Sequence, residues 1–416
     1  MRNTILAVAV VIFGCSLALG QVQERVLYSF GGTPRDGILP NSTLVADRDG
    51  NLFGTTTTGG AQGTCYGNGC GIVFELSRNP DDTWTESIIY NFCAGHSGFD
   101  CPDGATGSGL VIDSAGNLYG VRTDGGGTGT GVAFELSPPS MRGGTWTYTL
   151  LYTFCSVSNC QDGWGPSGTL LIDSAGNLYG TTGAGGTADG GVIFELSLDA
   201  GVWNETVLYD FCMFGQDGIC PDGENPRSGV VFDNVGNLLG TTWYGGSSDL
   251  SGGGTVFKLS PRFGGWVETV LYAKPGSNSI GLGPISFDHI GNMYSTFTPP
   301  VGNGNGGVGR LNIHGRVDTY LFNGNDGKDP VGGMLVDGQR RLLYGVTSGG
   351  PVGRGNIFQI DATGREGLVY AFCTQPDCAD GYQPLGGLIE DKLGNLFGTT
   401  SFGGANQEGV VFEITP

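Results

Sequence analysis

One short pattern recurs along the chain and constrains the fold more than any other feature. Its consensus is Asp-x-x-Gly-Asn-Leu-aromatic-Gly-Thr, and successive copies start 49 to 66 residues apart. The first residue of each copy is Asp47, Asp113, Asp173, Asp233, Asp288, Asp337 and Asp391. The copy at Asp337 is the loosest, because Arg340-Arg341 replaces Gly-Asn. A period of this length is typical of folds in which every repeat forms one supersecondary unit.

Each repeat is expected to form four short β-strands. In the third copy an apolar stretch ends at Asp173, and three further apolar segments cover residues 178–182, 191–196 and 203–211. These segments are rich in Val, Ile, Thr, Tyr and Phe, are bounded by Gly, Asn and Asp, and have no helical period. Seven four-stranded repeats predict an all-β, seven-bladed β-propeller. A β-helix or a pair of β-sandwiches is the alternative.

The two ends of the chain favour the propeller. Residues 26–30 resemble the fourth strand of a repeat that lacks its first three strands, and residues 410–415 resemble a third strand without its fourth. A ring closes when the N-terminal strand completes the blade formed by the C-terminal strands. An open solenoid would instead need polar caps at its ends. We therefore expect residues 21–416 to form one propeller domain.

The first twenty residues have the layout of a secretory signal peptide. Arg2 precedes an apolar run over residues 5–19, and Ala18-Leu19-Gly20 is a suitable cleavage site. The run is shorter than the roughly 20 residues that a membrane-spanning helix needs. We expect a signal peptide over residues 1–20 with cleavage after Gly20, although lipoprotein processing at Cys15 is an alternative. The protein is then secreted, extracellular or periplasmic, without a transmembrane segment.

Ten cysteines remain after residue 20, and their spacing predicts five local disulfides. An even number of cysteines in an exported protein indicates disulfides. In four of the couples the first cysteine directly follows a Phe and the second begins Cys-x-Asp-Gly, and repeats that lack one of these cysteines also lack the other. The predicted pairs are Cys65–Cys70, Cys93–Cys101, Cys155–Cys160, Cys212–Cys220 and Cys373–Cys378. Zinc is disfavoured because Cys-x-x-Cys knuckles are absent.

The repeat resembles a known bacterial sequence family. The string described above, followed by Val-Phe-Glu-Leu and Val-Leu-Tyr-x-Phe, is similar to the GloVer tandem repeat of exported "choice-of-anchor" proteins over residues 26–415. The resemblance implies an exported repeat protein of unknown biochemical activity, often with a C-terminal sorting segment. Because this sequence stops at its last strand, we expect release rather than surface anchoring.

The charge of the chain excludes two classes of partner. It has 39 acidic and 19 basic residues and a net charge of −20. A nucleic-acid interface needs a patch of Lys and Arg, and so does attraction to an anionic membrane surface. Neither nucleic acid nor membrane is therefore an expected partner.

Aspartates of Asp-Gly pairs form the first candidate site. Six repeats carry such an Asp ten or eleven residues before the repeat Asp, and the fifth has Ser277 and Asn278 nearby instead. In a propeller these positions fall on the mouth of the ring. The six residues are Asp36, Asp103, Asp162, Asp222, Asp326 and Asp380. A ring of carboxylates there would bind a cation such as Ca²⁺ or a hydroxyl-rich ligand. The alternative is that each Asp only forms a turn.

Aromatic residues between glycines form the second candidate site. Trp164, Trp243, Tyr244 and Tyr382 fall in mouth loops, where a flat ring would grip a sugar; burial under neighbouring loops is the alternative. A second aromatic set recurs before the fourth strand and is expected to pack in the core. It comprises Trp84, Trp146, Trp203 and Trp266.

No motif in the sequence assigns a reaction. The three histidines occupy non-equivalent positions, and neither Gly-x-Ser-x-Gly nor His-Glu-x-x-His occurs. We predict no catalytic residue and no cofactor apart from Ca²⁺. The expected function is a secreted binding module for a glycan or an extracellular protein. A glycosidase or lyase that uses mouth carboxylates, and a structural envelope protein, are the alternatives.

Overall fold

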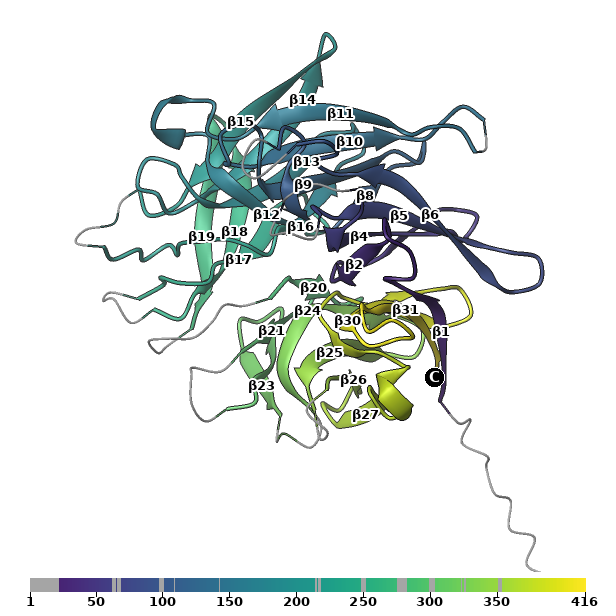
Figure 1. The fold of residues 1–416 in the computed structure, drawn as a ribbon. Helices are drawn as coiled ribbons and strands as arrows, with labels where there is room; N and C mark the ends of the chain where they lie inside the picture. The colour runs from purple at the N-terminus through teal and green to yellow at the C-terminus, as the bar shows by residue number, and fades with distance from the viewer. Residues whose placement is uncertain are drawn as a thin grey trace, which may run out of the picture.

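The computed structural model confirms a seven-bladed β-propeller. It describes residues 22–416 except 62–64, 66–68, 97–100, 108, 142, 214, 216–217, 248–251, 275–282, 299–303, 323, 325–326 and 351–353. The strands form seven antiparallel sheets of four or five strands, each of which is one blade (Figure 1). Residues of all seven blades line a central channel. Two 3-10 turns, η1 (Ser158–Cys160) and η2 (Pro376–Cys378), interrupt the strands. The described residues contain no helix long and apolar enough to cross a membrane.

The first four blades follow one another along the chain. Blade one contains β2 (Gly37–Pro40), β3 (Val45–Ala46), β4 (Leu52–Gly59), β5 (Ile72–Arg78) and β6 (Trp84–Asn91). Blade two contains β7 (Ala105–Gly107), β8 (Val111–Ile112), β9 (Leu118–Asp124), β10 (Val132–Ser137) and β11 (Thr147–Thr153). Blade three contains β12 (Trp164–Ile172), β13 (Leu178–Ala184), β14 (Val192–Asp199) and β15 (Val202–Asp210). Blade four contains β16 (Val230–Phe232), β17 (Leu238–Thr241), β18 (Thr255–Arg262) and β19 (Gly265–Ala273).

The last three blades include the one that closes the ring. Blade five contains β20 (Ser286–Phe287), β21 (Met293–Phe297), β22 (Gly307–Leu311) and β23 (Val317–Leu321). Blade six contains β24 (Lys328–Asp337), β25 (Leu342–Gly349), β26 (Asn356–Ile360) and β27 (Glu366–Ala371). Blade seven contains β28 (Tyr382–Pro384), β29 (Ile389–Glu390), β30 (Leu396–Phe402), β31 (Val410–Thr415) and β1 (Gln23–Ser29). Since β1 pairs antiparallel with β31, both ends of the domain share this blade as predicted.

The repeat Asp shapes the turn between the first two strands of a blade. In blade three the Asp173 Oδ1 accepts the backbone N–H groups of Ala175 and Asn177 at 2.8 and 2.9 Å. Its Oδ2 accepts the Asn177 side-chain amide at 2.9 Å. The same bonds recur at Asp47, Asp113, Asp233, Asp288 and Asp391. The recurring Asp and Asn are therefore turn residues.

Two phenylalanines pack across most blade interfaces and form the core. One lies just after the fourth strand of a blade and the other lies on the third strand of the next blade. Their ring centroids are 4.8 to 5.3 Å apart in Phe30–Phe74, Phe92–Phe134, Phe154–Phe194, Phe211–Phe257, Phe322–Phe358 and Phe372–Phe412. The third-strand ring covers a glycine of the second strand, such as Gly180 beneath Phe194, where a β-carbon would collide with the ring. This contact explains the Gly in Leu-Tyr-Gly-Thr.

All five predicted disulfides are present. They join Cys65 to Cys70, Cys93 to Cys101, Cys155 to Cys160, Cys212 to Cys220 and Cys373 to Cys378. Four of them staple the loop that leads from the fourth strand of one blade to the first strand of the next. The predicted signal peptide and Pro299-Pro300, where the fifth repeat departs from Gly-Gly, lie outside the described residues.

Candidate functional site

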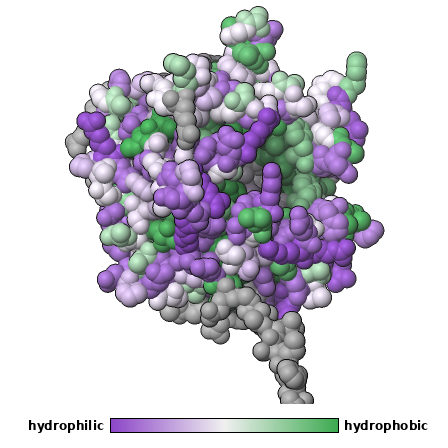
Figure 2. All heavy atoms as spheres, turned by 90° about the vertical axis from the view of Figure 1, so that its right-hand side faces the viewer, coloured by the Kyte–Doolittle hydropathy of each residue, from purple (hydrophilic) through white to green (hydrophobic). Residues whose placement is uncertain are grey.

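The central channel has a cavity volume of about 920 Å³ and is lined by residues of all seven blades. Small and apolar residues of the innermost strands and loops, such as Gly168 and Leu388, form most of the wall. Arg227 and Trp243 of blade four also line it. The Arg227 guanidinium lies over the Trp243 ring, 5.0 Å from the ring centroid. On the outer side drawn in Figure 2, hydrophilic residues cover most of the surface.

The Asp-Gly aspartates point into the blade interfaces. Asp36, Asp103, Asp162 and Asp380 are buried, Asp222 is half-buried, and Asp326 lies outside the described residues. Each of the five accepts the hydroxyl proton of a tyrosine from the preceding fourth strand at 2.8 to 2.9 Å. The pairs are Tyr28–Asp36, Tyr90–Asp103, Tyr152–Asp162, Tyr209–Asp222 and Tyr370–Asp380.

The same carboxylates also bind backbone amides of the connecting loop. Asp162 accepts N–H groups of Ser156 and Val157, and Asp103 accepts that of Cys93. Each Asp therefore fixes the loop that joins two blades. Asp36 and Asp222 keep one buried oxygen each without a hydrogen bond among the described residues. A cation-binding or ligand-binding role of these aspartates stays a prediction.

A glutamate on the fourth strand accompanies four of the aspartates, and sequence reasoning missed it. Burial, followed by repulsion from the neighbouring Asp, raises the pKa of Glu24, Glu86 and Glu268 to about 7 and that of Glu205 to about 8. The neighbouring pairs are Glu24–Asp380, Glu86–Asp36, Glu268–Asp222 and Glu205–Asp162. For Glu86, Glu205 and Glu268 the available signal was the recurring Trp-x-Glu, which Glu24 lacks. Because the pair recurs in four blades, it is a packing unit rather than a single active site.

Blade two replaces that glutamate by Tyr148. The buried Arg122 of the same blade donates to the carbonyl of Cys70, and its guanidinium carbon lies 3.8 Å from the Phe92 ring centroid. Arg122 occupies the strand position that holds a threonine, such as Thr182, in blade three. Burial lowers the pKa of Arg122 to about 10, and the negative charge of Asp103 acts in the opposite direction. In blade two, Arg122 and Tyr148 thus take the place of the glutamate that accompanies the Asp in four other blades.

Two of the four predicted mouth aromatics are solvent-exposed. Trp164 is 41% exposed and donates its indole N–H to Asp189 at 3.2 Å, and Tyr244 is 42% exposed. Trp243 packs against Arg227 as described above. Tyr382 is less exposed because it stacks on Phe402 with a centroid distance of 5.3 Å and lies beneath the guanidinium of Arg354.

Hydrogen bonds connect the loops that carry the blade three and blade four aromatics. Gly190 follows the Trp164 partner Asp189, and its carbonyl accepts the N–H of Asn225. The carbonyl of Asn225 in turn accepts the N–H of Trp243. Tyr244 pairs with Glu224 in a short antiparallel bridge. Trp164, Trp243, Tyr244 and Arg227 therefore belong to one contiguous region, which we call the blade three–four mouth.

The repeated tryptophans pack between blades as predicted. Trp84 contacts Phe397 edge-on with a centroid distance of 6.4 Å, and Trp146 contacts Phe53 at 5.9 Å. His96, His289 and His314 are exposed, and in the described part of the chain none belongs to a cluster of three metal-ligating side chains.

A family model assigns the repeat. The model described as the Gloeobacter/Verrucomicrobia repeat matches residues 67–284 and 252–416. The chain belongs to the Gloeobacter/Verrucomicrobia repeat family. The resemblance to the GloVer repeat inferred from the sequence is thereby confirmed. A search of curated proteins finds no significant match to this member of the family.

Solved structures share the fold with this Gloeobacter/Verrucomicrobia repeat protein at low identity. A fungal alcohol oxidase solved with copper is 14% identical with a TM-score of 0.51, and the match covers 94% of this chain and 76% of that chain. A Dyadobacter fermentans protein of unknown function is 12% identical with a TM-score of 0.47, covering 95% and 100%. At 14% identity, the similarity to the oxidase shows only a shared fold.

Proposed function

We propose that the protein is an exported binding module whose blade three–four mouth holds a glycan. The observation that carries the proposal is the exposure of Trp164 and Tyr244 on neighbouring loops beside Trp243, which lines the channel. An exposed aromatic ring can pack on the apolar face of a sugar, while polar neighbours bind the hydroxyl groups. Asp189 and Glu224 supply acceptors beside these rings, and Arg227 supplies donors. The five disulfides fit an extracellular or periplasmic location.

A glycan panel tests the proposal directly. We would apply the disulfide-intact protein to immobilised glycans with and without calcium, and follow both retention and release of products. The expected result is retention without product. Trp164→Ala and Tyr244→Ala are each expected to weaken binding about fivefold or more, since one aromatic contact contributes roughly 1 kcal/mol.

An exposed aromatic on the other face provides the matched control. Phe263 is fully exposed in the turn between β18 and β19, away from the mouth loops. Phe263→Ala should leave glycan retention unchanged. New reducing or unsaturated ends would replace the proposal by the glycosidase or lyase alternative. Absence of retention on every glycan would overturn it in favour of a protein partner or a structural role.

A further inference from the structure

The interface between blades four and five lacks both phenylalanines of the core pair. Lys274 donates its backbone N–H to Gly254, just as Phe211 donates to Gly191 one blade earlier, so Lys274 occupies the Phe position. On the third strand Gly309 stands opposite Ser295, in the register that Phe194 has opposite Gly180. Three residues of the regular packing have therefore changed together.

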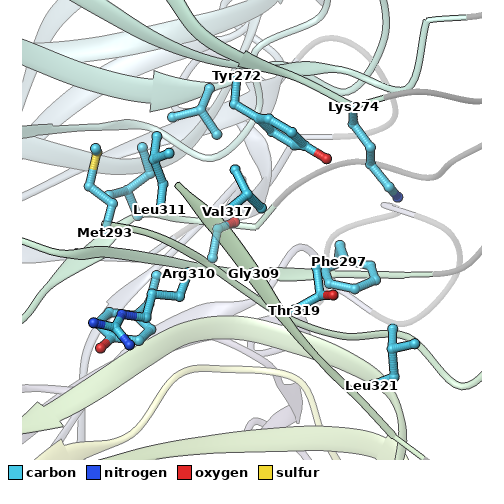
Figure 3. A pocket seen from close by; sticks show the side chains of 14 residues that line it. Tyr272, Lys274, Met293, Phe297, Gly309, Arg310, Leu311, Val317, Thr319 and Leu321 are labelled. Carbon is cyan, nitrogen blue, oxygen red and sulfur yellow. The ribbon is translucent and has the colours of Figure 1, made fainter. Parts of the chain in front are cut away.

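The missing rings leave an apolar cavity of about 230 Å³. Its walls come from blade four through Val256 and Tyr272 and from blade five through Met293, Leu311 and Val317 (Figure 3). Val317 pairs with Leu311, as Glu205 pairs with Leu196 in blade three, and so takes the place of that fourth-strand glutamate. An engineered cavity of about 150 Å³ binds benzene, so this one is large enough for a small apolar molecule.

A single amino group gives the cavity a polar end. The Lys274 Nζ lies 4.9 Å from the centroid of the Phe297 ring and 3.4 Å from the carbonyl oxygen of Thr298. Burial lowers the pKa of Lys274. Among the described residues it forms no ion pair with a carboxylate. Tyr272 is two residues earlier, so both side chains extend from the same side of the chain into this region.

The second cation in the cavity wall already has an acidic partner. The other basic residue in its wall, Arg310, alternates with Gly309 and Leu311 and has Asp318 within 4.0 Å. The Asp that pairs with tyrosine elsewhere is missing here, because residues 275–282 contain no acidic residue. Lys274 is thus a half-buried cation at the end of an apolar cavity, in a chain with a net charge of −20. Among the residues that the structure describes, no carboxylate pairs with it, although a buried cation is normally paired with one.

We propose that the cavity between blades four and five binds an amphipathic monocarboxylate, with its apolar body between Tyr272, Met293 and Val317 and its carboxylate on Lys274. A carboxylate would supply the missing counter-charge, and an alkyl or aryl body would replace the two absent Phe rings. The site is separate from the blade three–four mouth, so the proposal is independent of glycan binding.

Octanoate is the probe, and calorimetric titration of the full chain measures its affinity. We expect octanoate to bind and 1-octanol and acetate to bind at least tenfold more weakly, because they lack the carboxylate or the apolar body. Lys274→Met keeps the aliphatic stem and should weaken octanoate binding about tenfold or more, since a hydrogen bond to a charged group is lost. The exposed Lys392→Met is the matched control for charge and should bind as the wild type does.

A second variant fills the cavity. Gly309 has no positive φ, and a β-carbon there would meet only Ser295 and Phe297 at 3.7 Å or more. The double substitution Ser295→Gly and Gly309→Phe places the third-strand ring of the regular packing in the cavity and should abolish octanoate binding. Binding that survives this double substitution, equal affinity for octanol and octanoate, or no binding of octanoate to the folded wild type would each overturn the proposal. Circular dichroism confirms that each variant is folded.

Discussion

Six of the blade interfaces are packed in one way, and the interface between blades four and five is packed in another. At the six, two phenylalanines meet over a glycine, and at five of these the structure also describes an Asp–Tyr pair above them. The exceptional interface has Lys274, Gly309 and Ser295 at the corresponding positions. A β-bulge beside the third-strand Phe recurs in the other blades and is absent from the pairing of β22 with β23. The comparison shows that the ring closes without seven identical interfaces.

The largest effect should come from removing a regular core ring. Phe154→Ala deletes a fully buried side chain that packs on Phe194. We expect it to lower the free energy of unfolding by about 3 to 5 kcal/mol. Denaturant titration measures the change. Lys274→Ala changes the equivalent position of the exceptional interface. It should lower the free energy of unfolding much less, because a cavity already exists there. Equal losses would show that the two kinds of interface are energetically alike.

The next effect concerns the tyrosine hydroxyl. Tyr152→Phe removes the donor to the buried Asp162, which should destabilise the protein by about 1 to 2 kcal/mol. Tyr272→Phe removes the equivalent hydroxyl from blade four, where the following connection has no Asp, and should cost under about 0.5 kcal/mol. Thermal unfolding of both variants under identical conditions checks the difference. A larger loss for Tyr272→Phe would contradict it.

The Glu–Asp pairs predict that the stability of the protein depends on pH. The exceptional interface has Val317 in place of the glutamate, so it does not contribute to this effect. Because folding raises the Glu205 pKa from 4.5 to about 8, the folded state holds a proton that the unfolded state releases, and stability falls as the pH rises from 4.5 to 8. Glu205→Gln should remove this contribution and gain about 1 kcal/mol at pH 9, allowing for partial exposure. Unfolding curves at pH 5 and pH 9 test it. A Gln variant with the wild-type pH profile would contradict the assignment.

Making the exceptional interface regular should stabilise the protein. Combining Lys274→Phe, Ser295→Gly and Gly309→Phe fills the cavity with the two rings found elsewhere. We expect a gain of about 0.5 to 2 kcal/mol, typical of cavity filling with residues that the other repeats already use. The melting temperature in the absence of ligand is the measurement. A lower melting temperature would mean that the bulge-free strand pairing of blade five cannot accommodate the rings.

The fold could be predicted from the sequence because the features that define it lie within each repeat. The Asp-x-x-Gly-Asn turn, the strand alternation and the split final blade are local patterns, and paired loss of cysteines identified the disulfides. The partners of Asp162 were harder to foresee, because Tyr152 and Glu205 reach it only when strands are assembled. Lys274 and Gly309 were missed since each is an ordinary loop or strand residue by itself. Only alignment of the repeats by strand register shows that both replace Phe.

The pairing of β1 with β31 has a consequence for synthesis. A ribosome makes the chain from its N-terminus, so β1 emerges before every other strand of blade seven and its partner β31 emerges after them. Until residues 410–415 arrive, one edge of blade seven stays unpaired, and an open strand edge invites association with other chains. A chain interrupted before residues 410–415 would therefore keep an open edge in blade seven that favours aggregation.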